Sequence, residues 1–164
     1  MKKSKISAIA MGLVLMCGSV FADTQTANMN VTATIHSGCD LQAEDLNFGT
    51  IVLTSVAHAT ADILVTCPSN TVGYIRLNEG LHNLSTQRRL LQTIGQTDYL
   101  IDYNLYSDSG YSVPFTALSA PGTGGVTFNG VGELQRITVY GEIPTQTSKP
   151  NGYYTDVVQV ILDY

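Results

Sequence analysis

The sequence predicts an all-β protein, an antiparallel β-sandwich, on three observations. Short segments of alternating apolar and polar residues recur along the chain, and such alternation fits strands because successive side chains point to opposite faces. Clusters of Gly, Pro, Asn and Ser separate these segments and favour turns. No segment combines helical spacing with the start and stop signals of a three-turn amphipathic helix. Many short strands joined by turns are typical of a sandwich.

Residues 1–22 are predicted to be a cleaved secretory signal. Three lysines precede the short apolar run Ile6–Met16, and residues 20–22 read V-F-A, a small-x-small type of cleavage site. The run is too short for a good membrane span, so we expect a mature chain of residues 23–164 and no membrane insertion. Cys17 raises a rival, a lipoprotein signal, although the methionine before it is larger than such signals require.

The charge balance of the mature chain excludes two classes of partner. The sequence holds 8 basic and 13 acidic residues, and three of the basic residues lie in the predicted signal. A nucleic-acid-binding protein needs a basic face, which this chain cannot supply. The scarcity of Lys and Arg also argues against binding to an anionic membrane surface.

Two cysteines, Cys39 and Cys67, remain after the signal. An exported chain with one pair of cysteines is expected to form one disulfide. The alternative is two free buried thiols. About 140 mature residues are enough for one domain with a real core.

The stretch Ala27–Ile35 reads A-N-M-N-V-T-A-T-I and alternates over nine residues. Its polar positions are Asn and Thr, and it contains no Gly or Pro. It is either the first strand of the sandwich or a strand offered to a different molecule. Its apolar positions are Ala27, Met29, Val31, Ala33 and Ile35.

The strands of the body follow in order. An extended region runs from Leu41 to Gly49, and Ala120–Gly125 is expected to be a loop. Residues 81–97 are less regular; a helical turn would fit Leu84–Ile94, but a loop and a short strand fit better. The expected strands are Asp62–Cys67, Val72–Leu77, Arg89–Thr93, Tyr99–Tyr106, Val126–Asn129, Leu134–Ile143 and Tyr154–Tyr164.

No set of residues in the sequence points to catalysis, a metal or a cofactor. His36, His58 and His82 lie in separate segments without ligand spacing, and no G-x-S-x-G elbow or phosphate loop occurs. Four tyrosines could line a sugar-binding surface, but in a sandwich they more often pack at the rim of the core. These four are Tyr103, Tyr106, Tyr140 and Tyr154.

A series of motifs in a fixed order carries a resemblance that covers essentially the whole mature chain. The motifs are C-x-L at Cys39–Leu41, L-N-F-G at Leu46–Gly49, V-T-C-P at Val65–Pro68, Y-N-L-Y-S-D at Tyr103–Asp108, I-T-V-Y-G-x-I-P at Ile137–Pro144 and G-x-Y-x-D-x-V-x-V at Gly152–Val160. The chain resembles the spore coat protein U domain family, which includes pilin subunits of archaic (Csu-type) chaperone–usher pili. Residues 81–97 match the family least well.

The resemblance implies an incomplete immunoglobulin-like sandwich that lacks its last strand. A periplasmic chaperone would fill the resulting groove first, and at the outer-membrane usher the N-terminal strand of the next subunit would replace it. Cys39 and Cys67 would join the first two strands of the body. The groove would be lined by Val158, Val160, Leu162 and Tyr164.

These expectations define three segments: a signal (1–22), a donor-strand extension (23–36) and a pilin domain (37–164). Polymerisation into an adhesive, biofilm-promoting cell-surface fibre, by way of the periplasm, is the expected function. The C-terminal carboxylate would meet basic residues of the chaperone. The alternatives are a secreted or spore coat protein and a carbohydrate-binding adhesin module.

Overall fold

A computed structural model describes residues 24–35, 38–116 and 125–164. The chain divides into two units, residues 1–34 and 35–164, which are described separately. The predicted signal peptide and most of the predicted loop Ala120–Gly125 lie outside the described residues. Residues 24–35 have no regular secondary structure and every one of them is exposed.

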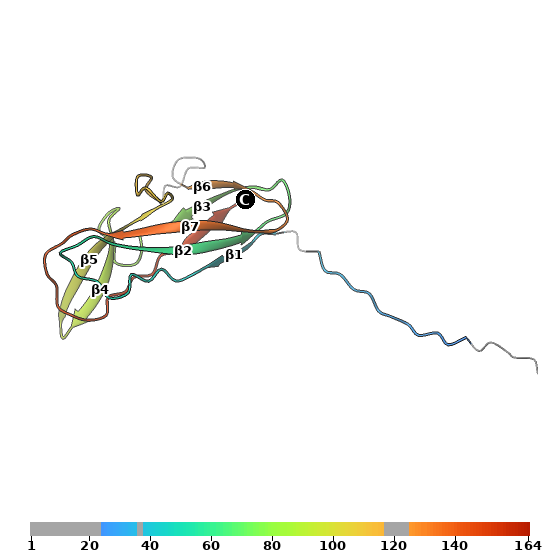
Figure 1. Cartoon of the computed structure of the whole chain (residues 1–164), viewed down its shortest axis with the longest axis horizontal. Coiled ribbons are helices and arrows are strands. Elements are labelled where there is room, and N and C mark those ends of the chain that lie inside the picture. Colours follow the sequence, from blue (N-terminus) through green and yellow to red (C-terminus); the bar gives the residue numbers. More distant parts are fainter. Residues whose placement is uncertain (1–23, 36–37, 117–124) are drawn as a thin grey trace, which may run out of the picture. The chain divides into compact units, whose positions relative to one another are not determined.

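Within the described residues, eight strands form two antiparallel sheets (Figure 1). The five-stranded sheet has the order β1-β2-β7-β5-β4, and the three-stranded sheet has the order β6-β3-β8. This arrangement confirms an all-β fold of antiparallel sheets. The strands are β1 (Asp40–Ala43), β2 (Ala57–Thr66), β3 (Val72–Leu77), β4 (Arg88–Ile94), β5 (Thr97–Tyr106), β6 (Val126–Asn129), β7 (Leu134–Ile143) and β8 (Val160–Asp163).

The core lies between the two sheets and follows the alternation in the sequence. In β3, Ile75 and Leu77 are buried, whereas the intervening Arg76 is only half-buried. The same pattern holds in β2, β5 and β7, as the sequence predicts. The buried apolar residues are Ile63, Val65, Cys67, Ile75, Leu77, Ile101, Tyr103, Leu105, Phe115, Phe128, Val139 and Ile143.

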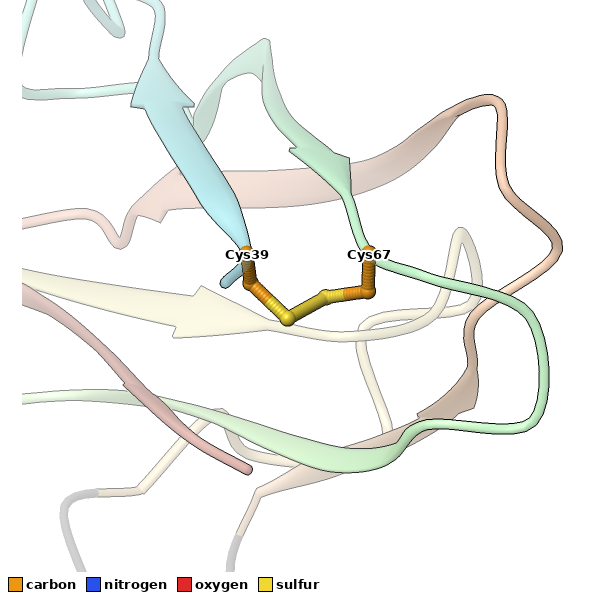
Figure 2. Close-up of a disulfide and its surroundings, with 2 residues drawn as sticks. All are labelled: Cys39 and Cys67. Atoms are coloured by element: carbon orange, nitrogen blue, oxygen red, sulfur yellow. A yellow bond between two sulfur atoms is a disulfide. The ribbon is translucent and has the colours of Figure 1, made fainter. Parts of the chain in front are cut away.

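A disulfide joins Cys39 to Cys67 and confirms the expected pairing (Figure 2). Cys39 immediately precedes β1, and Cys67 immediately follows β2. Antiparallel pairing of Asp40 with Thr66 brings the two cysteines to the same end of these strands, where their Cα atoms are 4.3 Å apart. The disulfide therefore ties the edge strand β1 to its neighbour.

Two strand boundaries differ from the sequence prediction, one at the start of a strand and one at an end. The strand expected at Asp62–Cys67 begins five residues earlier, at Ala57. Its first half carries alanines at Ala57, Ala59 and Ala61, which give little apolar contrast, yet these residues pair in register with β7. The extended region expected from Leu41 is a strand only as far as Ala43.

The last strand is also shorter than predicted, because Tyr154–Tyr164 contains strand only at Val160–Asp163. Thr155 exchanges two backbone hydrogen bonds, of 2.8 and 3.0 Å, with Leu91 of β4 in the five-stranded sheet. Val160 instead pairs with Leu77 of β3 in the three-stranded sheet. The segment thus changes sheets between these points, which interrupts the ladder although the alternation of burial continues.

The other strand predictions hold closely. Val72–Leu77, Val126–Asn129 and Leu134–Ile143 have the expected bounds, and a strand at Arg88–Ile94 replaces the helical alternative. No helix within the described ranges is long and apolar enough to cross a membrane.

Removing the disulfide should destabilise the sandwich. The bridge closes a separation of 28 residues, and a loop of that size stabilises a fold by about 3.5 kcal/mol in the chain-entropy model. Urea denaturation of the Cys39→Ser/Cys67→Ser double variant should therefore show a loss of about 3.5 kcal/mol in the free energy of unfolding. A reducing agent should lower the stability of the wild type alone, and an equal effect on the double variant would contradict the assignment.

Candidate functional site

A long groove of about 1220 Å³ runs over the core of the sandwich. One wall comes from residues 43–54, which connect β1 to β2, and the other comes from residues 148–158 with Val160. Core side chains form the base of the groove. They are Ile63, Leu77, Ile101, Tyr103, Leu105, Val139 and Ile143, together with the half-buried Leu90.

The first wall packs its apolar side chains inward against β7. A Cβ atom on Gly141 would lie only 2.9 Å from Leu46 Cδ2 and from Phe48 Cζ, so only glycine leaves room for them. The Phe48 ring also meets Tyr103 edge-on, with a centroid distance of 6.4 Å. These contacts fix the wall through side chains and leave its backbone uninvolved.

The backbone of the first wall is largely unpaired. At one end the N–H of Glu44 donates to the Asp62 carbonyl at 2.9 Å, and at the other the N–H of Gln146 donates to the Leu53 carbonyl at 2.9 Å. Between them, residues 45–51 make no backbone-to-backbone hydrogen bond with the described part of the chain. The N–H of Gly49 donates instead to Asn47 Oδ1 at 2.7 Å. Most of this segment therefore borders the groove with backbone groups that lack backbone partners.

The second wall is held at separate points rather than by a ladder. Thr155 is bonded to Leu91. The Gln159 carbonyl accepts a hydrogen bond from the N–H of Asn78 at 3.0 Å, and the N–H of Gln159 donates to Asn78 Oδ1 at 2.8 Å. Between these points, residues 156–158 make no backbone hydrogen bond within the described ranges. Both walls of the groove thus offer free backbone groups.

A buried carboxylate, Asp156, interrupts the apolar lining of the second wall. Its side chain is only 1 % exposed. Its oxygens accept hydrogen bonds from the N–H groups of Leu81 (2.9 Å) and His82 (3.3 Å) and from the Tyr103 hydroxyl (2.8 Å). His82 Nδ1 lies 3.0 Å from the same carboxylate.

The sequence prediction did not include Asp156 among the site residues. It occupies an inward-facing position in the alternating series that contains Tyr154, Val158 and Val160. A charged residue in such a series was the available signal, because a buried charge needs specific partners. The alternation alone could not identify those partners, which come from residues 81–82 and from β5.

Burial shifts the pKa values of two side chains near Asp156. Burial, followed by the hydrogen bond to Asp156, raises the pKa of Tyr103 well above its ordinary value. Burial also lowers the pKa of Arg88, whose guanidinium donates to the carbonyl oxygens of Leu77, Asn78 and Phe115 at 2.8–2.9 Å. The Asp156 carboxylate therefore lies in a buried polar cluster that includes a nearby cation.

The predicted groove residues occupy two different positions. Val158 and Val160 line the groove. Leu162 of β8 pairs with Ile75 of β3 and packs against the core, and Tyr164 is 66 % exposed. Neither residue lines this groove.

The predicted donor residues lie in neither sheet, and all are exposed. Met29, Val31 and Ile35, for example, are 86 %, 85 % and 94 % exposed. The set is Ala27, Met29, Val31, Ala33 and Ile35.

The four tyrosines considered for sugar binding do not form one surface. Tyr103 is buried in the core, and Tyr154 is half-buried with its hydroxyl donating to the Pro150 carbonyl at 2.8 Å. Tyr106 and Tyr140 are paired across β5 and β7, where both touch the ring of Tyr111 edge-on. Among the described residues, no three His, Cys, Asp or Glu side chains gather as metal ligands would.

The two sheets, the disulfide and the groove define an all-β sandwich domain. Residues 25–161 match the Spore Coat Protein U domain, and the chain belongs to that family. It is 30 % identical to Protein U of Myxococcus xanthus over an alignment 179 positions long, which covers 99 % of this chain and 98 % of that relative. The family expected from the sequence motifs is confirmed.

One solved structure supports the fold. It is the CsuC–CsuE chaperone–tip adhesion subunit pre-assembly complex from archaic chaperone–usher Csu pili of Acinetobacter baumannii, with a TM-score of 0.56 and 21 % identity. The match covers 77 % of this chain but only 39 % of the length of the matched chain. The Hda pilus minor tip subunit HdaB of E. coli matches with a TM-score of 0.43 and 16 % identity, covering 75 % of this chain and 79 % of HdaB.

The raised pKa of Tyr103 predicts a loss of stability at alkaline pH. A tyrosine whose pKa is higher in the folded state contributes stability that is complete below its ordinary pKa of about 10 and is lost as the pH rises above that value. Urea denaturation between about pH 9 and pH 11 should show this decline, and Tyr103→Phe should flatten it. The control is Tyr153→Phe at an 84 % exposed position, which should leave the slope unchanged. Equal slopes in both variants would contradict the assignment.

Proposed function

We propose that this protein is a structural pilin subunit that polymerises by donor-strand exchange into an adhesive, biofilm-promoting fibre on the cell surface. The observation that carries the proposal is the groove, whose two walls present unpaired backbone over an apolar base. An inserted strand would pair with residues 45–51 on one side and with residues 156–158 on the other. It would satisfy backbone groups and cover core side chains in the same step.

The strand proposed to enter the groove is Ala27–Ile35 of a second copy. It has five apolar side chains at alternate positions and no Gly or Pro, so one face can enter the groove while its backbone completes both ladders. Burying each larger apolar side chain would contribute about 1.5–3 kcal/mol. Because the donor segment and the groove are different parts of the chain, the contact is head-to-tail and builds an open fibre.

A periplasmic chaperone and an outer-membrane usher are the proposed assembly partners. The solved complex of a Csu tip subunit contains a chaperone, and a bare apolar groove is an aggregation hazard that such a partner would cover. In this proposal a chaperone strand occupies the groove first, and the donor strand replaces it at the usher. The C-terminal carboxylate would meet basic residues of the chaperone.

Two features of the chain support export to the periplasm, where the proposed assembly with the chaperone begins. The Cys39–Cys67 disulfide is consistent with an oxidising compartment, and residues 1–22 carry the expected signal features. We therefore place the chain in the periplasm during assembly and on the cell surface afterwards.

A secreted coat protein is the second candidate. The family name and the full-length similarity to Protein U of Myxococcus xanthus favour this setting. Both candidates allow assembly through the groove and differ in where the polymer is deposited. Immunogold labelling would separate them, since a pilus gives extended filaments and a coat gives a continuous layer.

A matched pair of substitutions in the donor segment tests the polymerisation step. Val31→Asp places a carboxylate on the face that enters the groove, and Thr32→Asp places one on the opposite face. Burying an unpaired carboxylate costs several kcal/mol, so Val31→Asp should reduce subunit capture by at least about 100-fold. Co-expression with chaperone and usher, followed by electron microscopy, should show fibres for Thr32→Asp and none for Val31→Asp. Fibres of equal abundance from both variants would contradict the proposal.

A further inference from the structure

We propose that Asp156 is a positioning residue that holds the second wall of the groove ready to receive the inserted strand. This inference rests on the proposed function, because it concerns how that same groove captures a strand. The sheet ladder does not hold the wall here: residues 156–158 make no backbone hydrogen bond with described residues. Between Thr155 and Gln159, the side chain of Asp156 supplies the polar attachment of the wall.

The attachment reaches two other elements at once. Leu81 and His82 contribute two N–H donors from the turn after β3, and Tyr103 contributes its hydroxyl from β5. The His82 ring adds a fourth contact, at 3.0 Å. Since Asp156 is almost completely buried, its carboxylate depends on these donors, and losing it would leave the part-buried Tyr103 hydroxyl and His82 N–H without their acceptor.

The turn after β3 is shaped to leave room for the carboxylate. Gly80 adopts a φ of +80°, in the left-handed region that favours glycine. A Cβ atom at this position would collide with the Asp156 carboxylate. Asn78 Oδ1 accepts hydrogen bonds from the N–H of Gly80 at 3.1 Å and from the N–H of Gln159 at 2.8 Å, which links the same turn to the wall a second time.

The arrangement suits strand capture because it fixes the wall without using its backbone. A ladder bond would hold the wall but would also consume the N–H and C=O groups that an incoming strand needs. A side-chain anchor leaves those groups free and already ordered, so less conformational entropy is lost when the strand pairs with them. The positioning role therefore predicts an effect on strand capture beyond any effect on overall stability.

The experiment measures binding of a synthetic peptide of residues 24–35 to the full-length chain, whose own donor segment is disabled by Val31→Asp. This host should bind the peptide. Adding Asp156→Ala or Gly80→Ala should weaken binding by at least about tenfold, because the first change removes the anchor and the second displaces it. Gly95→Ala is the matched control, since Gly95 also has a positive φ, of +65°, but an added Cβ there meets nothing within 4 Å. It should leave binding unchanged.

A second control separates positioning from stability. The Cys39→Ser/Cys67→Ser change should lower the melting temperature of the host while leaving the groove walls intact, so peptide affinity should be retained. If affinity falls with melting temperature in every variant, the effect is merely structural and the inference is overturned. Unchanged affinity in Asp156→Ala and Gly80→Ala would also overturn it. If the host itself does not bind the peptide, the proposed function fails instead.

Discussion

Backbone N–H and C=O groups lie without backbone partners along both walls of the groove, in residues 45–51 and 156–158 of the described chain. Water can satisfy such groups only while the groove stays open, and an open groove leaves apolar core side chains beneath it uncovered. Folding of the chain alone leaves either the backbone groups unpaired or the apolar side chains uncovered. A strand from a second molecule would pair with the backbone groups and cover the side chains together, which is why we interpret the groove as an acceptor for a strand.

The surrounding structure keeps this gap from collapsing. Leu46 and Phe48 fill the space left by Gly141 under the first wall. At the end of the same wall, where the N–H of Gln146 donates to the Leu53 carbonyl, the Gln146 side chain bonds both the N–H and the carbonyl of Asp102, at 2.9 and 2.8 Å. These contacts and the Asp156 anchor come mostly from side chains, so they hold the walls apart and leave their backbone free.

Period-two alternation was enough to predict β3, β6 and β7 to the residue, because each strand buries one face and has turn residues beside it. Alternation did not predict the strand bounds where the pattern of apolar residues and the backbone pairing do not coincide. Residues 154–159 keep the alternation while changing sheets, and Ala57–Ala61 pair with β7 without strong apolar contrast. Asp156 could not be assigned from sequence because its partners, residues 81–82 and Tyr103, are distant in the chain.

Hydrogen exchange of the wall amides tests the central claim most directly. In the free chain the amides of residues 45–51 and 156–158 should exchange quickly, because they have no backbone acceptor. In assembled fibres the amides that point into the groove should exchange at least about 100-fold more slowly, since an inserted strand supplies acceptors. Equally fast exchange of these amides in the free and the assembled protein would contradict the account.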